Sequence, residues 1–140
     1  ERTEALQQAN EELKREIRDR QHAEKTLRES EERFRSIFEN VSVGIALLDL
    51  DGYILTANEA KCRFLGYSSG QLVGMHFSRL THPEDWSLDA NLFESIVCGK
   101  RTNYTIDKRY LRQDGTCVWG RITVSVIKHD NGSPRYIAVV

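Results

Sequence analysis

Two oppositely charged side chains, Asp107 and Arg109, alternate along a segment whose pattern is typical of a β-strand. Residues two apart on a strand point to the same face of the sheet. If that face is the inner one, the two side chains form a buried ion pair that could orient a polar ligand such as a carboxylate. The alternative is an ion pair at the rim of the sheet, with no role in binding. The spacing leaves both interpretations open.

The other reactive side chains do not form a catalytic or metal-binding set. The cysteines Cys62, Cys98 and Cys117 are widely separated and lack the spacing of a metal site. His76 and His82 lie apart from any cluster of cysteine or carboxylate residues. No nucleophile, base and orienting group occur together, and there is no glycine-rich phosphate loop. We therefore expect that this segment is not an enzyme and binds no metal.

The composition limits the partners of the chain. Its 140 residues include 20 basic and 21 acidic side chains. This near-balance gives no electrostatic footprint for nucleic acid or an anionic membrane surface, and no apolar stretch approaches the roughly 18 residues of a membrane span. The odd number of widely spaced cysteines favours a reducing compartment. We expect a cytoplasmic segment that contacts neither nucleic acid nor membrane, which is compatible with a membrane anchor elsewhere in a longer parent protein.

The first predicted element is a long helix over residues 1–39, because no glycine or proline occurs before Gly44. Its apolar residues recur at heptad spacing in a narrow stripe that Glu16 and Arg20 interrupt. Such a stripe cannot stabilise an isolated helix of this length in water, so we expect a parallel homodimer. The alternative is a helix folded back over its own domain. The stripe comprises Leu6, Leu13, Leu27 and Phe34, with Ala9, Ala23 and Ile37 on the companion position.

A globular domain follows the helix, and we place the boundary between a coiled-coil segment, residues 1–33, and a domain, residues 34–140. Turn residues divide the domain into short segments. Two strands are predicted first, then three helices, then three strands, which indicates an α+β fold with helices on one face of a sheet. The predicted strands cover residues 43–50, 53–56, 104–112, 116–128 and the chain from 135; the predicted helices cover residues 59–65, one turn from 68, and a longer helix from 83 to 98.

A succession of short motifs in this domain resembles that of bacterial PAS sensor domains. The motifs occupy residues 30–40, 44–45, 49–52, 58–60, 65–67, 72–74, 82–85, 114–115 with Trp119, and 132–134. The segment over residues 6–25 resembles the helical linkers that join such domains in sensor histidine kinases and cyclic-di-GMP enzymes. The resemblance implies the PAS fold, with a five-stranded antiparallel sheet, and an output domain that this chain does not contain.

The resemblance also implies a ligand pocket between the inner sheet face and the helices. A two-residue turn at residues 114–115 would pair Asp107 with Ile122 and place Arg109 on the same, inner face. Tyr110 and Trp119 would then lie on the outer face, and an error of one residue would exchange the two faces. The predicted pocket lining is Phe64, Phe77, Leu92, Ile96, Asp107, Arg109 and Ile122. The predicted dimer interface is Leu6, Leu13, Leu27, Phe34 and Trp119.

The positions of the cysteine and histidine residues bear on whether the chain binds flavin or haem, the known cofactors of PAS domains. Residues 62–65, Cys-Arg-Phe-Leu, resemble the tetrapeptide around the photoactive cysteine of light-sensing flavin PAS domains. That cysteine, however, follows the later glycine of the family, where this chain has Phe77. Haem-binding PAS domains use a histidine of the long helix, and residues 86–98 contain none. We expect neither flavin nor haem, and the sequence identifies no other small molecule.

Two functions are compatible with these features. In the first, the domain is a non-catalytic sensory and dimerisation module of a bacterial signal-transduction protein, which relays the state of its pocket through the helix to an output domain. In the second, the pocket is filled by the domain's own side chains. The domain is then a ligand-free PAS scaffold for protein interaction and dimerisation.

Overall fold

The computed structural model describes all 140 residues, which divide into two compact units, residues 1–38 and 39–140. Helix α1, Arg2–Asn40, makes up the first unit, and its last two residues belong to the second. Phe38 is the only buried residue of α1. The predicted long helix is confirmed, and the predicted boundary after residue 33 lies earlier in the same helix. No helix of the chain is both long enough and apolar enough to cross a membrane.

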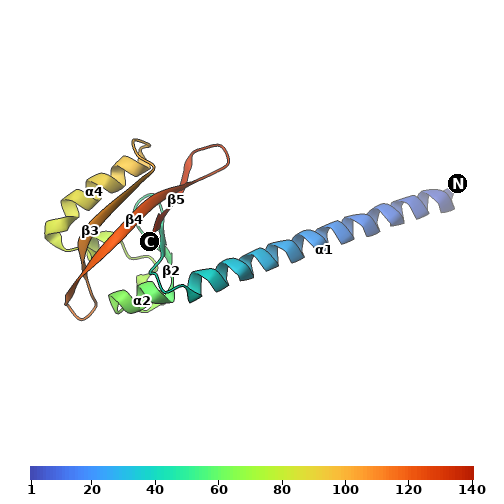
Figure 1. The fold of residues 1–140 in the computed structure, drawn as a ribbon. Helices are drawn as coiled ribbons and strands as arrows, with labels where there is room; N and C mark the ends of the chain where they lie inside the picture. Colours follow the sequence, from blue (N-terminus) through green and yellow to red (C-terminus); the bar gives the residue numbers. More distant parts are fainter. The chain divides into compact units, whose positions relative to one another are not determined.

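The second unit contains the five-stranded antiparallel sheet that the sequence predicts (Figure 1). Its strands lie in the order β2-β1-β5-β4-β3. Each neighbouring pair is antiparallel, so the last strand of the chain inserts between the first strand and β4. The strands are β1 Ala46–Leu48, β2 Ile54–Ala57, β3 Asn103–Leu111, β4 Cys117–Lys128 and β5 Pro134–Val139.

The helices between β2 and β3 begin and end as their capping residues predict. Asn58 accepts a hydrogen bond from the backbone of Lys61, and Gly66 ends α2 in the left-handed conformation. Ser68 and Gln71 form a capping box around the single turn of α3. The sequence did not predict the 3₁₀-helix η1. The elements are α2 Glu59–Leu65, α3 Ser69–Leu72, η1 Phe77–Leu80 and α4 Pro83–Val97, and α4 packs along β3 and β4.

The predicted register of β3 against β4 is wrong by one residue. Asp107 pairs with Arg121, and the strands close at Leu111 and Cys117. The connecting loop is longer than the predicted two-residue turn, because Gly115, with φ of 85°, follows the turn in the left-handed conformation and adds a third loop residue. The amide of Arg112 donates to the carbonyl of Thr116 at 2.8 Å and closes this loop. Since side chains alternate between faces, the one-residue difference exchanges the predicted inner and outer faces of β3. On β4, Ile122 is buried and Trp119 is exposed, so both keep the faces predicted for them.

The core lies between the inner face of the sheet and helices α2 to α4. With the corrected register, Tyr104, Lys108 and Tyr110 of β3 point into it, opposite Ile122 and Val124 of β4. Helix α4 contributes its buried face, Asp89, Phe93 and Ile96. Lys61 of α2 is buried there as well, so two lysines and one aspartate lie within an otherwise mainly apolar core.

Candidate functional site

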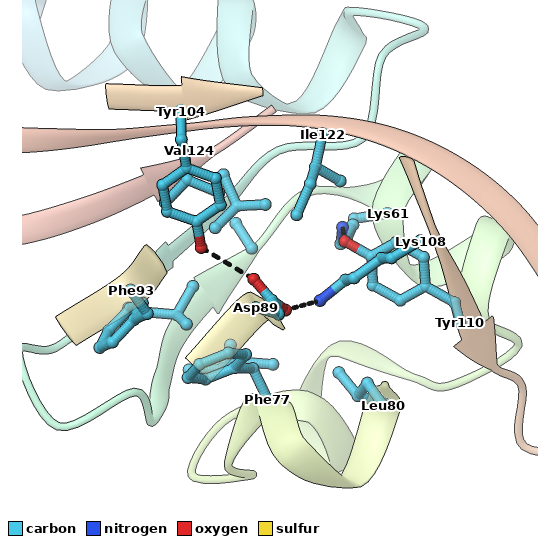
Figure 2. Close-up of a pocket in the computed structure, with 14 residues that line it drawn as sticks. Lys61, Phe77, Leu80, Asp89, Phe93, Tyr104, Lys108, Tyr110, Ile122 and Val124 are labelled. Carbon is cyan, nitrogen blue, oxygen red and sulfur yellow. Dashed lines mark hydrogen bonds and ion pairs between the residues drawn. The ribbon is translucent and has the colours of Figure 1, made fainter. Parts of the chain in front are cut away.

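Three ionisable side chains from three different elements meet in this interior (Figure 2). Lys61 comes from α2, Asp89 from α4 and Lys108 from β3. Their exposed fractions are 6%, 1% and 2%. Lysine and aspartate are rarely buried to this extent unless they are paired. We refer to Lys61, Asp89 and Lys108 as the interior triad.

Both carboxylate oxygens of Asp89 have partners in the interior. The hydroxyl of Tyr104 donates to Oδ1 at 2.8 Å, and Nζ of Lys108 donates to Oδ2 at 2.5 Å (Figure 2). Nζ of Lys108 also donates to Oγ1 of Thr81 at 2.9 Å. Asp89 and Lys108 thus form a buried salt bridge with further hydrogen bonds on each side, which is the arrangement that burial of such a pair requires.

Lys61 has no carboxylate partner. Its Nζ donates one hydrogen bond, to the hydroxyl of Tyr110 at 3.1 Å, and lies 4.4 Å from the centre of the Tyr110 ring. Nζ of Lys108 lies 4.6 Å from the centre of the same ring. The ring stabilises a nearby cation but cannot neutralise it. When all three side chains of the interior triad are ionised, the interior carries one unmatched positive charge.

This unmatched charge shifts the ionisation of Lys61. The pKa of Lys61 is lowered from 10.5 to about 7, mainly by burial and in addition by the charge of Lys108, while the charge of Asp89 opposes the change. Burial also lowers the pKa of Lys108, although its salt bridge with Asp89 acts in the opposite direction. Burial raises the pKa of Tyr104 and of Tyr110, so both phenols stay protonated and able to donate. Near neutral pH, Lys61 is therefore divided between its charged and neutral forms.

A small cavity of about 30 Å³ lies among these groups. It has room for about two water-sized groups. Its polar walls are the triad with Tyr104 and Tyr110, and the remaining walls are apolar. The apolar lining is Ala46, Leu48, Ile54, Phe77, Leu80, Phe93, Ile122, Val124 and Val139.

A larger groove of about 330 Å³ lies on the other side of Lys61. Lys61, Tyr110 and Ile122 line both the groove and the inner cavity, so these three side chains form the wall between them. The other residues of the groove are Ser42, Val43, Gly44, Ala60, Phe64, Trp119, Gly120, Arg121 and Val140.

Lys61 also packs against the segment over residues 41–45, which directly follows α1. A Cβ atom added to Gly44 would lie 3.1 Å from Cδ and 3.2 Å from Cα of Lys61, closer than ordinary packing allows. Asn58 joins the same segment to the start of α2: its Oδ1 accepts from the amide of Ile45 at 2.8 Å, and its Nδ2 donates to the carbonyl of Val43 at 2.9 Å. The first turn of α2 and the segment that follows α1 are therefore held together through Asn58.

The predicted pocket lining is only partly brought together at this site. Phe77 and Ile122 line the cavity, and Phe64 lines the neighbouring groove. Ile96 is fully buried and Leu92 partly buried in the core, and neither lines the cavity.

The predicted inward placement of Asp107 and Arg109 is wrong, because the register of their strand differs by one residue. Asp107 forms an exposed ion pair with Arg121, with Nε and Oδ1 2.8 Å apart. Arg109 binds both carboxylate oxygens of Asp85 at 3.0 Å, and these hydrogen bonds lower the pKa of Asp85 to about 2. Trp119 lies on the outer face as predicted and is 64% exposed. The alternative, an ion pair between Asp107 and Arg109 at the rim of the sheet, does not hold either, because the two side chains pair with Arg121 and Asp85 and not with each other.

The interior triad was not predicted from the sequence, although β3 carries a pattern that indicates part of it. Tyr104, Ile106, Lys108 and Tyr110 alternate along the strand, and a face with three large apolar or aromatic residues is the better candidate for burial. Asp89 precedes Phe93 and Ile96 by one and two helical turns, on the apolar face of its helix.

Comparison with known proteins agrees with this architecture. The family model for the PAS fold matches residues 32–140. The chain belongs to the PAS family. The PAS domain is 39% identical over 112 residues to the probable diguanylate cyclase DgcE of Escherichia coli, a match that covers 80% of this chain. It is 28% identical over 108 residues to the sensor histidine kinase TmoS of Ectopseudomonas mendocina, covering 77% of this chain.

These relatives are much longer than the PAS chain, which spans 10% of the first and 11% of the second. A solved PAS domain from Colwellia psychrerythraea superposes with a TM-score of 0.69 at 24% identity, covering 78% of this chain and 92% of that one. A LOV protein of Rhodobacter sphaeroides superposes with a TM-score of 0.67 at 18% identity, covering 80% and 65%. These two likenesses concern the fold. The predicted family is confirmed, and the chain is a PAS module of the kind that signalling proteins contain.

Proposed function

We propose that this PAS domain is the non-catalytic sensory module of a bacterial signal-transduction protein, a sensor histidine kinase or a cyclic-di-GMP enzyme. The state of the interior triad is relayed through residues 41–45 to α1, and from there to an output domain elsewhere in the protein. One observation carries this proposal: Lys61 lines the interior cavity and also packs against Gly44. A change in the charge or position of Lys61 therefore acts directly on the segment that leads to α1.

Relay requires a ligand or proton that prefers one packing of this segment over another. Asn58 supplies the mechanical connection, because it holds residues 43–45 on the first turn of α2. When Lys61 moves, α2 and the segment after α1 are constrained to respond together.

Dimerisation through α1 is part of the proposed function. Leu6, Leu13, Leu27 and Phe34 are between 55% and 70% exposed along the helix. A helix with this apolar stripe gains stability when a second copy covers it. We propose a parallel coiled coil over residues 1–33, with Trp119 of the outer sheet face as a second contact between copies.

We propose that the domain acts in the cytoplasm without flavin or haem. A cavity of about 30 Å³ is far smaller than the several hundred Å³ of typical cofactor sites. Phe77 packs against Phe93 and Trp86 with tilted rings, whose centres are 4.7 and 4.9 Å apart. By the family resemblance, Phe77 stands where the light-sensing flavin domains have their photoactive cysteine. Burial raises the pKa of the Cys62 thiol, which disfavours the reactive thiolate.

Hydrogen exchange tests the relay in the chain as it stands. Lys61→Met removes the charge but keeps an unbranched side chain, and the matched control is Lys100→Met, which alters an exposed lysine outside the site. We expect Lys61→Met to change amide exchange at residues 41–45 and in the last turns of α1, and Lys100→Met to leave both unchanged. A change restricted to α2 and β3 would contradict the relay.

The ligand-free scaffold is a second candidate, and the small cavity favours it. Most of the interior is filled by side chains, so little space remains for a metabolite. In that case the domain contributes only dimerisation, and the exchange of α1 is independent of Lys61.

A further inference from the structure

We propose that the interior site of this PAS domain binds one small oxyanion of single negative charge, of the size of formate or nitrite, between Lys61 and Lys108. This inference names the class of ligand that the proposed sensory module binds. The signalling consequence of binding rests on the proposed function. The binding itself follows from the charges, the free donors and the space in the interior.

Charge balance is the first argument. The ionised interior triad has two cations and one anion, and no other charged side chain lines the cavity. Two elements place titratable groups around Lys61: β3 contributes Lys108 with the phenols of Tyr104 and Tyr110, and α4 contributes Asp89. The cavity residues that come from η1, β1, β2, β4 and β5 are all uncharged. On its own helix, Glu59 and Arg63 pair with each other at the surface. One bound monoanion makes the buried set neutral, which removes the cost of an unmatched interior charge.

Available hydrogen-bond donors are the second argument. Protonated Lys61 has three N–H donors and uses one, on the hydroxyl of Tyr110. That hydroxyl accepts from Lys61, so its own hydrogen is available to a further acceptor. Both oxygens of Asp89, by contrast, are occupied by Tyr104 and Lys108. The interior therefore offers unused donors where its acceptors are already engaged, which suits an anion and disfavours a cation.

The size of the cavity selects among anions. A volume of about 30 Å³ accommodates an ion of a few heavy atoms. A multivalent or larger metabolite such as citrate would have to displace Phe77, Phe93 or Ile122 from the core. Formate and nitrite are planar and small, and both present two oxygens to donors on one side.

The groove beside the cavity supplies the entry path. Lys61, Tyr110 and Ile122 line both spaces. An anion that enters from the groove therefore meets the hydrogen bond between Lys61 and Tyr110 first. Its arrival draws Nζ of Lys61 away from the position in which the lysine stem packs on Gly44.

Proton linkage gives the proposal a distinctive measurement. A bound anion favours the charged form of Lys61, whose pKa lies near 7 in the empty site. Binding should therefore take up protons above pH 7 and weaken by up to about tenfold per pH unit there. Below pH 6, where Lys61 is already charged, proton uptake should vanish.

We would titrate the whole chain with sodium formate and sodium nitrite at constant ionic strength, by calorimetry in buffers of different ionisation enthalpy. Amide shifts of the ¹⁵N-labelled protein locate the site. We expect binding of one anion, uptake of close to one proton at pH 8, and shifts centred on Lys61, Tyr110 and Gly44. Citrate should not compete. Binding of formate alone or nitrite alone would identify which oxyanion chemistry the site prefers.

Two variants complete the test. Lys61→Met should abolish both binding and proton uptake while the fold persists, and Lys100→Met should behave as the wild-type chain. Retained binding in Lys61→Met, proton uptake that does not depend on Lys61, or absence of binding by both anions would overturn the proposal.

These outcomes are independent of the relay experiment. If neither anion binds but Lys61→Met still alters exchange in α1, the ligand class is wrong and the sensory function stands. If an anion binds with proton uptake and α1 does not respond, the site is real and the relay is wrong.

Discussion

At the scale of single residues, the interior of this PAS domain is organised by an imbalance of charge. Asp89 accepts hydrogen bonds from Lys108 and Tyr104 and makes none with Lys61. Lys61 is held by burial of its stem against Gly44 and by one phenol. A buried lysine without a carboxylate decreases stability when it is charged, so evolution of a purely structural core would favour an apolar residue at this position. The presence of Lys61 at this position is therefore a reason to assign the interior a function.

The first prediction concerns the pH dependence of stability. The pKa of Lys61 is about 7 in the folded chain and ordinarily 10.5, so between these values the unfolded chain binds more protons. Stability must therefore rise with pH across this window. We expect the wild-type chain to gain about 2 kcal/mol from pH 7 to pH 9 relative to Lys61→Met, measured as the free energy of unfolding in urea. Equal pH profiles for the two chains would show that Lys61 is not buried as a lone cation.

At the scale of elements, Asn58 connects helix α2 to the segment that follows α1. It caps α2 through the amide of Lys61, and it bonds the backbone of Val43 and Ile45 in the segment after α1. The side chain is fully buried. One residue therefore fixes both where α2 begins and how the chain enters β1.

The second prediction follows from this arrangement. Asn58→Ala should destabilise the domain by about 3 kcal/mol, because it removes a helix cap and two partly buried hydrogen bonds to the backbone of Val43 and Ile45. The control is Ser68→Ala in the exposed capping box of α3, for which we expect about 1 kcal/mol. Thermal or urea unfolding compares the two directly, and similar losses for both would mean that Asn58 acts only as a cap.

At the scale of the whole molecule, the chain combines a PAS domain with a helix that buries almost none of its residues. A helix of 39 residues with leucines exposed along one stripe is stable when another helix covers that stripe. Dimerisation would also make a rotation or register shift of α1 transmissible, because two helices in register respond as a pair.

The third prediction tests this assembly. We expect the chain to sediment as a dimer, and the double variant Leu13→Glu, Leu27→Glu to sediment as a monomer, because charges in the seam of a coiled coil cannot be paired there. Leu88→Glu is the matched control, since Leu88 is 57% exposed on α4 and lies outside the predicted interface. A dimer that survives the double variant would assign the contact to the sheet face around Trp119.

Most helices and strands of this protein could be predicted from local chemistry in the sequence. Asn58, Ser68 and the residues around Pro83 cap helices through bonds to nearby backbone, and the glycine turns place the strands along the chain. The PAS family can be recognised from the same local motifs, since their order along the chain can be read without knowing which residues contact one another.

The residues of the site are brought together by contacts that form only in the folded chain. The register of β3 and β4 depends on one loop residue at Gly115, and this residue moved Asp107 and Arg109 outside and Lys108 inside. Lys61, Asp89 and Lys108 are far apart in sequence and come from three elements, so no local pattern joins them. These three side chains shift one another's pKa values because they are buried together in an interior of low dielectric constant.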